Sequence, residues 1–245
     1  MFYLRFKYPH LQNLTKKTNF AVCKEVNKLG VTMNEDGQKI LLPEPTLRRL
    51  PWYLAYVNML RTQKIEYVSS TQISRKINVD ASQIAKDLSF LNIKGKTRIG
   101  YQVETLATEL SNFLGFHNDH TAFMIGAGSL GSALIQDSGL MQFGLHIVAG
   151  FDVDEKVVGT EICGIPIYHI SELPEREKQY KAEIGILAVP VEHAQESADL
   201  LVANGLRAIW NFTPFRIKVA DNVVIQNTSI YAHLAVMYNR INGNK

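Results

Sequence analysis

The chain has 245 residues, 46% of them apolar and 20% charged, with 26 Lys and Arg against 23 Asp and Glu. It is long enough for one large domain or two small ones, and its ordinary charge and hydrophobicity exclude a disordered chain. The longest apolar runs are too short to cross a membrane, no secretory signal pattern opens the chain, and two isolated cysteines predict a reduced, cytoplasmic protein.

The net charge of +3 conceals an uneven distribution along the chain. Residues 1–100 carry 17 Lys and Arg against 7 Asp and Glu, residues 101–120 carry none against 3, and residues 121–245 carry 9 against 13. A basic first part and a mildly acidic second part favour two domains with different partners, the basic one suited to a polyanion. The alternative is chance clustering of charge on a solvated surface.

Residues 1–42 form an extension without sustained apolar periodicity. Apolar residues at helical spacing then predict an amphipathic helix over residues 46–61. Thr46 is its expected N-cap, and Pro51 inside the pattern predicts a kink or a restart.

Residues 69–91 show the pattern of a helix-turn-helix. Ser69 or Ser70 can cap the first helix, and Asp80 can cap the second, with Gln83 completing a capping box. The next stretch, residues 92–103, predicts a β-hairpin with a basic tip, and residues 103–116 predict a helix. A winged-helix domain is therefore expected at residues 43–118.

The polar side chains of this domain fit DNA binding, because the second helix of such a pair enters the major groove. The candidates are Gln83 and Lys86 for bases, Ser70, Thr71 and Ser82 for phosphates at helix starts, and Lys94, Lys96 and Arg98 in the wing. The alternative is a helix pair with a polar outer face that binds no DNA.

From residue 121 onwards, strands and helices alternate. The expected strands are 121–128, 145–154, 182–191, 206–212 and 222–227, and the expected helices are 129–138, 170–181, 192–205 and 228–241. Alternation of this kind predicts right-handed βαβ units and a parallel sheet. The fold class is therefore α/β, with a Rossmann domain at residues 119–227 after the winged helix and a helix at residues 228–245.

A glycine-rich turn follows the first of these strands, with the sequence Gly126-Ala127-Gly128-Ser129-Leu130-Gly131. In a dinucleotide-binding turn the first glycine permits the tight bend, the second admits a pyrophosphate and the third lets helix and strand pack closely. Asp152, at the end of the second strand, can bind a ribose diol and would repel a 2′-phosphate, which favours NAD(H) over NADP(H). The alternative is a glycine turn in a domain that binds nothing.

No catalytic set and no metal site stand out in the sequence. His146, His169, His193 and His233 have no obvious acid–base partner, and each is interpreted as structural. There is no zinc-protease, serine-hydrolase or P-loop motif. The chain is therefore predicted not to be an enzyme.

In their order along the chain, these segments resemble the Rex family of bacterial redox-sensing transcriptional repressors, from about Leu42 to Ile241. The resemblance rests on LPEPTLRRLPWY, VSSTQIS, NVDASQIAKDLSF, GKTRIGYQV, GAGSLG, FDVD, GIPIYHI, ILAVP and NFTPFRIKV. It implies a homodimer in which the C-terminal helix, residues 228–245, is swapped between Rossmann domains. It also implies a repressor of palindromic operator DNA that NADH releases.

NAD+ is expected to compete with NADH for the same pocket. The nicotinamide is expected near strand ends at the switch point of the sheet, at Val189, Pro190, Asn211, Thr213 and Pro214.

Some positions depart from the family pattern. Many members have two arginines where this chain has Ala85 and Lys86, and an aspartate where it has Ser229. These differences put one DNA contact and the usual latch between domains in question. The alternative function is an NAD-dependent oxidoreductase with a helical cap domain, and a third is a CoA-binding Rossmann module.

Overall fold

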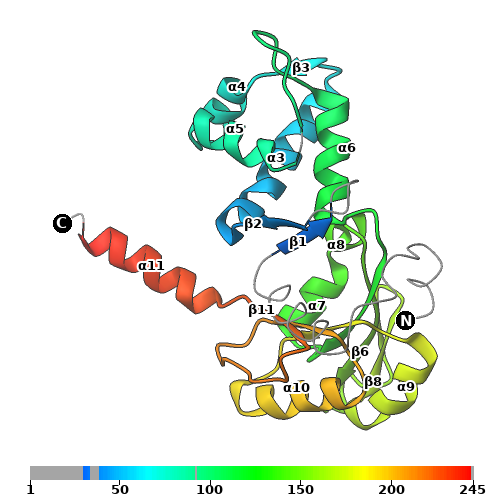
Figure 1. Ribbon diagram of the computed structural model, residues 1–245. Helices are drawn as coiled ribbons and strands as arrows, with labels where there is room; N and C mark the ends of the chain where they lie inside the picture. Colours follow the sequence, from blue (N-terminus) through cyan, green and yellow to red (C-terminus); the bar gives the residue numbers. More distant parts are fainter. Residues whose placement is uncertain (1–29, 34–38, 92, 244–245) are drawn as a thin grey trace, which may run out of the picture. The chain divides into compact units, whose positions relative to one another are not determined.

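The computed structural model describes residues 30–33, 39–91 and 93–243, which group into two compact units (Figure 1). The division falls between Phe116 and His117, close to the boundary expected after residue 118. Within the described part of the chain, no helix is both long and apolar enough to span a membrane.

The first unit combines helices with short antiparallel strands. In chain order its elements are β1 (Gly30–Met33), β2 (Lys39–Leu42), α3 (Glu44–Thr62), β3 (Tyr67–Val68), α4 (Ser70–Ile77), α5 (Ala81–Ser89), β4 (Tyr101–Gln102) and α6 (Val103–Leu114). β1 pairs with β2, and β3 pairs with β4. The hairpin of β1 and β2 was not foreseen, because strands of four residues are too short to show a period. Residues 1–29 and 34–38 of the expected extension lie outside the described residues.

Helix α3 is one continuous helix with Pro51 in its interior, so of the expected kink or restart, the restart does not occur. The expected N-cap is also wrong, because the helix begins after Pro43 instead of at Thr46. A proline in the first turn supplies the helical φ angle and lacks an N–H that would be unpaired there. Thr46 lies inside the helix, is buried, and donates its hydroxyl to Asp87.

Helices α4 and α5 form the expected helix pair, and local caps fix both starts. Ser69 caps α4 through a complete capping box with Gln72. Asp80 caps α5, accepting a backbone N–H two residues on at 2.8 Å. Gln83 does not complete a box at α5, because its amide donates to Asp87 instead.

One apolar core holds the four helices α3 to α6 together. Its fully buried members are Leu42 of β2, Leu50, Tyr53 and Val57 of α3, Ile73 of α4, Ile84 and Leu88 of α5, and Leu106 and Leu110 of α6. The positions in the helices follow the helical spacing of the sequence, so the helical core of this unit was predictable from periodicity.

The wing is a tight turn closed by one antiparallel bridge instead of an extended hairpin. Lys96 and Gly100 exchange backbone hydrogen bonds of 2.8 and 2.9 Å. β4 then pairs with β3, the strand just before α4. Gly100 has a φ of +108°, and a Cβ there would collide with the carbonyl oxygen of Val68. The close approach of the two segments therefore requires a glycine.

The second unit is built on a twisted sheet flanked by helices. Its elements are β5 (His120–Ile125), α7 (Ser129–Gln136), α8 (Ser138–Gln142), β6 (Leu145–Asp152), β7 (Glu161–Ile162), β8 (Ile165–His169), η2 (Ile170–Glu172), α9 (Leu173–Tyr180), β9 (Ile184–Leu187), η3 (Val191–His193), α10 (Ala194–Ala203), β10 (Ala208–Asn211), β11 (Val224–Asn227) and α11 (Ile230–Gly243).

The sheet order among the described residues is β11-β10-β9-β5-β6-β8-β7. Every neighbouring pair is parallel except β7 with β8. This is the doubly wound Rossmann order, and its topological switch point lies between β5 and β9. The expected parallel sheet is confirmed, whereas β8, the short β7 beside it and α8 were not predicted.

Alternate side chains of β5 face opposite sides of the sheet. Phe123 and Ile125 belong to a core shared with α9 and α10, whereas Met124 packs with Ile135 of α7. Both faces of the sheet are therefore covered, as a parallel sheet requires.

Helix α11, red in Figure 1, forms as expected but has no buried residue. Apolar side chains at helical spacing along it are exposed, with Ile230 at 49%, Met237 at 48% and Ile241 at 57%. Ser229 caps the helix, because its hydroxyl accepts the backbone N–H of Ala232 at 3.2 Å.

Candidate functional site

The glycine turn joins β5 to α7 in a geometry that only glycine tolerates at two of its positions. Gly126 has a φ of +90°, and a Cβ there would lie 2.6 Å from the carbonyl oxygen of Ala188. A Cβ on Gly131 would collide with the carbonyl oxygen of Gly126. A Cβ on Gly128, by contrast, would meet nothing within 4 Å, so the backbone is open to a ligand at this point.

Asp152 holds the end of β6 against this turn. Its Oδ2 accepts the backbone N–H of Ala127 at 2.7 Å. Its Oδ1 accepts the N–H groups of Val153 and Asp154 at 2.7 and 3.0 Å. The carboxylate expected to bind a ribose therefore also fixes the shape of the turn.

A cavity of about 300 Å³ opens beside the turn, at the carboxyl ends of β5, β6 and β9. The predicted residues that line it are Gly126, Gly128, Asp152, Val189 and Pro190. Residues that the sequence did not single out add apolar walls, from Ile125, Phe151, Val153, Ile170 and Leu200, and polar groups, from His193, Glu196 and Ser197. An apolar slot with a few polar groups is typical of a small-molecule site.

The remaining predicted cofactor residues do not line this cavity. Ser129 and Leu130 are exposed in the first turn of α7. Asn211 and Thr213 are buried at the end of β10 and bonded to each other, and Pro214 is exposed beyond them. The structure therefore brings together the glycine turn, Asp152 and the end of β9 around one cavity, whereas the end of β10, next to β9 in the sheet, does not line it.

Of the four histidines singled out in the sequence, three make contacts away from the cavity and one lines it. His146 contacts Asp119 at 2.9 Å, His169 accepts a backbone N–H at the start of η2, and the ring of His233 contacts the backbone carbonyl four residues earlier. His193 lines the cavity, which its position at the start of a helix did not reveal. Among the described residues, no group of three or more potential metal ligands occurs.

In the first unit, the carboxylate of Asp87 lies fully buried between α3 and α5. Arg49 binds both of its oxygens, at 2.6 and 2.8 Å. Thr46, Tyr53 and Gln83 donate further hydrogen bonds of 3.0, 2.6 and 2.8 Å. This network, which we call the Asp87 cluster, fixes the second helix of the pair against α3.

The cluster shifts the ionisation of its members. Burial raises the pKa of the Asp87 carboxyl, but the hydrogen bonds from Arg49, Tyr53, Gln83 and Thr46 outweigh it, and the pKa lies below its ordinary value. Burial and the bond to Asp87 raise the pKa of the Tyr53 hydroxyl, and the bond to Asp87 raises that of Arg49. Asp87 and Arg49 are therefore both charged across the whole physiological pH range.

The cluster also decides which side chains α5 presents to solvent. Ser82, Ala85, Lys86 and Ser89 are exposed, whereas Gln83 is half-buried and held by the cluster. The hydroxyl of Ser82 donates to the capping carboxylate of α5 at 2.6 Å. Of the two residues predicted to read bases, Lys86 is the one that projects freely.

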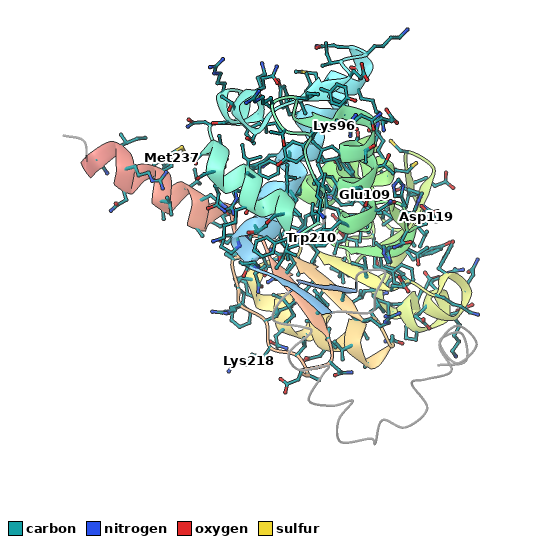
Figure 2. All side chains as sticks on the ribbon, turned by 45° about the horizontal axis from the view of Figure 1, so that its top comes forward. Lys96, Glu109, Asp119, Trp210, Lys218 and Met237 are labelled. Carbon is teal, nitrogen blue, oxygen red and sulfur yellow. The ribbon has the colours of Figure 1, made fainter. Side chains whose placement is uncertain are left out.

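The other predicted DNA contacts lie at the start of α4 and in the wing. Thr71, Lys94 and Arg98 are exposed, and Ser70 is half-buried. Lys96, labelled in Figure 2, donates to the hydroxyl of Tyr67 at 2.9 Å and lies 5.1 Å from its ring centroid. The wing therefore presents two exposed cations and a third that is held by an aromatic ring.

Two family models match the two halves of the chain. One, described as a putative DNA-binding protein N-terminus, matches residues 41–89, and the other, described as a CoA binding domain, matches residues 117–215. The redox-sensing transcriptional repressor Rex of Bacteroides fragilis is 56% identical over 220 residues, covering 88% of this chain and 99% of that protein. Rex of Porphyromonas gingivalis is 56% identical over 200 residues, covering 82% and 92%.

Solved structures of a protein named RSP, a Rex-family repressor, are similar over both units. The structure of RSP with β-NAD+ and operator DNA has a TM-score of 0.79 at 32% identity and covers 83% of this chain and 94% of that one. The structure of RSP with β-NADH has a TM-score of 0.74 at 33% identity and covers 83% and 95%.

Proposed function

The chain belongs to the Rex family of redox-sensing transcriptional repressors, and from this premise we propose that its first unit binds operator DNA and that NADH in its second unit releases the DNA. The observation that carries the proposal is the similarity to one repressor in complex with β-NAD+ and operator DNA, which extends over both units. Its Rex relatives are transcriptional repressors. We therefore propose a cytoplasmic regulator, and not an enzyme.

The cavity fits the adenosine half of NAD(H). The open backbone at Gly128 and the N-terminus of α7 suit a pyrophosphate, and Asp152 suits a ribose diol. The apolar walls, including Val153 and Ile170, suit the faces of an adenine ring. The nicotinamide would then lie towards Val189 and the loop after β10, where the sheet order places the other half of a dinucleotide site.

The DNA side of the proposal uses the exposed face of α5 and the wing. Lys86 supplies direct contact in the major groove, while Lys94, Lys96 and Arg98 supply charge for the backbone. Ala85 adds only a methyl group, so this chain reads its operator with one cation fewer than the pattern of two arginines would give. Gln83 acts within the Asp87 cluster and orients the helix.

A homodimer completes the proposal, because a palindromic operator matches a protein twofold axis. The exposed apolar side chains of α11, among them Tyr231, Val236 and Tyr238, are the surface that a second copy would cover. NADH and operator DNA then bind two different global states, so each weakens the other by the same factor. NAD+ competes for the cavity and shifts the equilibrium little, because its affinities for the two states are similar.

A titration of labelled promoter DNA, with and without NADH, tests this function. Binding in the absence of NADH, its loss with NADH and its retention with NAD+ would support the repressor. Turnover of an alcohol or a hydroxy acid with NAD+ would instead favour the oxidoreductase with a helical cap. Displacement of NADH by CoA would favour a CoA-binding Rossmann module, because the second family model is described as a CoA binding domain.

A further inference from the structure

The side chain of Asn211, the last residue of β10, is completely buried and uses all its hydrogen-bonding capacity. Its Oδ1 accepts the backbone N–H and the hydroxyl of Thr213, at 3.0 and 2.8 Å. Its Nδ2 donates to the backbone carbonyl of Phe215 at 2.7 Å and to the Oδ1 of Asn227 at 2.9 Å. One side chain thus joins the loop after β10 to the last residue of β11.

A second link runs beside the first. The indole N–H of Trp210, labelled in Figure 2, donates to the hydroxyl of Thr228 at 2.9 Å. The backbone N–H of Thr228 donates to the carbonyl of Asn211 at 2.8 Å. Ser229, the next residue, caps α11. The connection into α11 is therefore held by the last two residues of β10.

The same end of β10 is tied to the strand that leads to the cavity. The backbone N–H of Phe212 donates to the carbonyl of Leu187, the last residue of β9, at 2.9 Å. Two residues later, Val189 lines the cavity. In a sheet of this order a dinucleotide lies across these strand ends. Its far half would meet residues 212–215, the loop that the Asn211 side chain holds in place.

We propose that Asn211 is a positioning residue that couples cofactor binding to α11: the loop, the Asn211 side chain and Asn227–Thr228 move as one body, so a shift of the loop turns the start of the helix. The inference rests on the proposed function, because it names the transmission between the cofactor site and the dimer helix. The transmission then runs through hydrogen bonds between uncharged side chains that precede α11. The position that many family members fill with an aspartate, here Ser229, is occupied by helix capping instead.

The test cuts the link at its exposed end. Asn227→Ala removes the acceptor of the Asn211 amide, and Thr228→Val removes the acceptor of the Trp210 indole. Asn227 is exposed, so its variant should fold like the parent. Gln226→Ala is the matched control, because Gln226 is also exposed on β11 and its side chain bonds only the neighbouring backbone carbonyl among the described contacts.

Three quantities are measured for each protein: the Kd for NADH, the Kd for operator DNA, and the Kd for operator DNA at saturating NADH. The ratio of the last two is the coupling factor. We expect Asn227→Ala to lower the coupling factor about three- to tenfold, the equivalent of one hydrogen bond, while the Kd for NADH alone and the Kd for operator DNA alone each change less than about twofold. Thr228→Val should lower it in the same way, and Gln226→Ala should leave it unchanged. A purely structural role would change the separate affinities or the unfolding midpoint instead.

The outcomes separate the two proposals. A parent protein whose operator binding ignores NADH overturns the proposed function, and this inference with it. A parent that responds to NADH, together with an Asn227→Ala variant that keeps the parental coupling factor, overturns this inference alone. Equal losses in Asn227→Ala and Gln226→Ala also overturn it, because the effect then belongs to β11 in general.

Discussion

The buried carboxylate of Asp87 stabilises the first unit by an amount that one substitution should reveal. Asp87→Ala removes the acceptor of five side-chain hydrogen bonds, two of them from Arg49. The Arg49 side chain, only 20% exposed, loses its counter-charge. Removing one partner of a buried pair destabilises a protein by about 3–5 kcal/mol, a large part of the roughly 5–15 kcal/mol that a domain has. We therefore expect the unfolding free energy of this unit to fall by about 3–5 kcal/mol.

Urea unfolding followed by tryptophan fluorescence measures this loss. The chain has two tryptophans, so Trp210→Phe leaves Trp52 on α3 as the reporter of the first unit. Asp80→Ala is the matched control, because it removes an exposed aspartate that caps the same helix and should cost about 1 kcal/mol. A loss for Asp87→Ala no larger than that for Asp80→Ala would refute the reasoning.

The same carboxylate predicts the response to acid. Its pKa is lower in the folded chain than its ordinary value, so it contributes stability above that value and loses it as the pH falls through the lowered pKa. Asp87→Asn carries no charge at any pH, and its unfolding free energy should therefore fall less steeply than that of the parent below about pH 4. Parallel curves for the two proteins would show that the pair makes no charge-dependent contribution.

Three further predictions concern binding and assembly. Operator affinity should fall steeply with salt, and Arg98→Ala should weaken binding to all sequences and flatten the dependence of affinity on salt, whereas Lys86→Ala should change sequence preference. Equal salt dependences for the parent and Arg98→Ala in fluorescence-anisotropy titrations would exclude contact between the wing and the DNA backbone. NADH should bind more tightly than NADPH. Asp152→Ala should narrow the difference, because NADH loses the acceptor for its ribose diol and NADPH loses the repulsion of its 2′-phosphate; calorimetry with both cofactors checks this. Truncation after Asn227 removes α11 and should yield monomers or aggregates, and a soluble dimer in sedimentation would contradict the role of the helix.

Much of the fold could be predicted from interactions between residues that are close together in the sequence. The caps at Ser69 and Asp80 depend on residues two or three positions away, so the sequence sufficed to predict the helix pair. The glycine turn was equally predictable, because Gly126 needs a positive φ and a Cβ on Gly131 would collide with the carbonyl oxygen of Gly126 in the same turn. The strand β8 escaped prediction because five residues beginning Ile165-Pro166 are too short to show a period.

Contacts between residues that are far apart in the sequence could not be predicted. Asp87 and Arg49 are 38 positions apart, and nothing in the surrounding sequence distinguishes a buried aspartate from an exposed one. Gln83 consequently looked free to read a base, although the fold bonds its amide to Asp87. Similarly, Asn211 was expected beside a cofactor because of where its strand ends. Only the folded structure shows that its side chain is already fully bonded.

The tether between Asp152 and Ala127 has a consequence for what the protein reports. NADH and NAD+ carry the same adenosine, and the turn that would hold it is fixed by a hydrogen bond within the protein, from the Ala127 N–H to Asp152. The adenosine half of the site therefore binds both redox forms equally and does not distinguish their oxidation states. Any discrimination arises at the nicotinamide end. The adenosine half sets how much of the protein is occupied, according to the total concentration of NADH and NAD+. The nicotinamide half sets the response. DNA release therefore follows the ratio of NADH to NAD+ and not the amount of either.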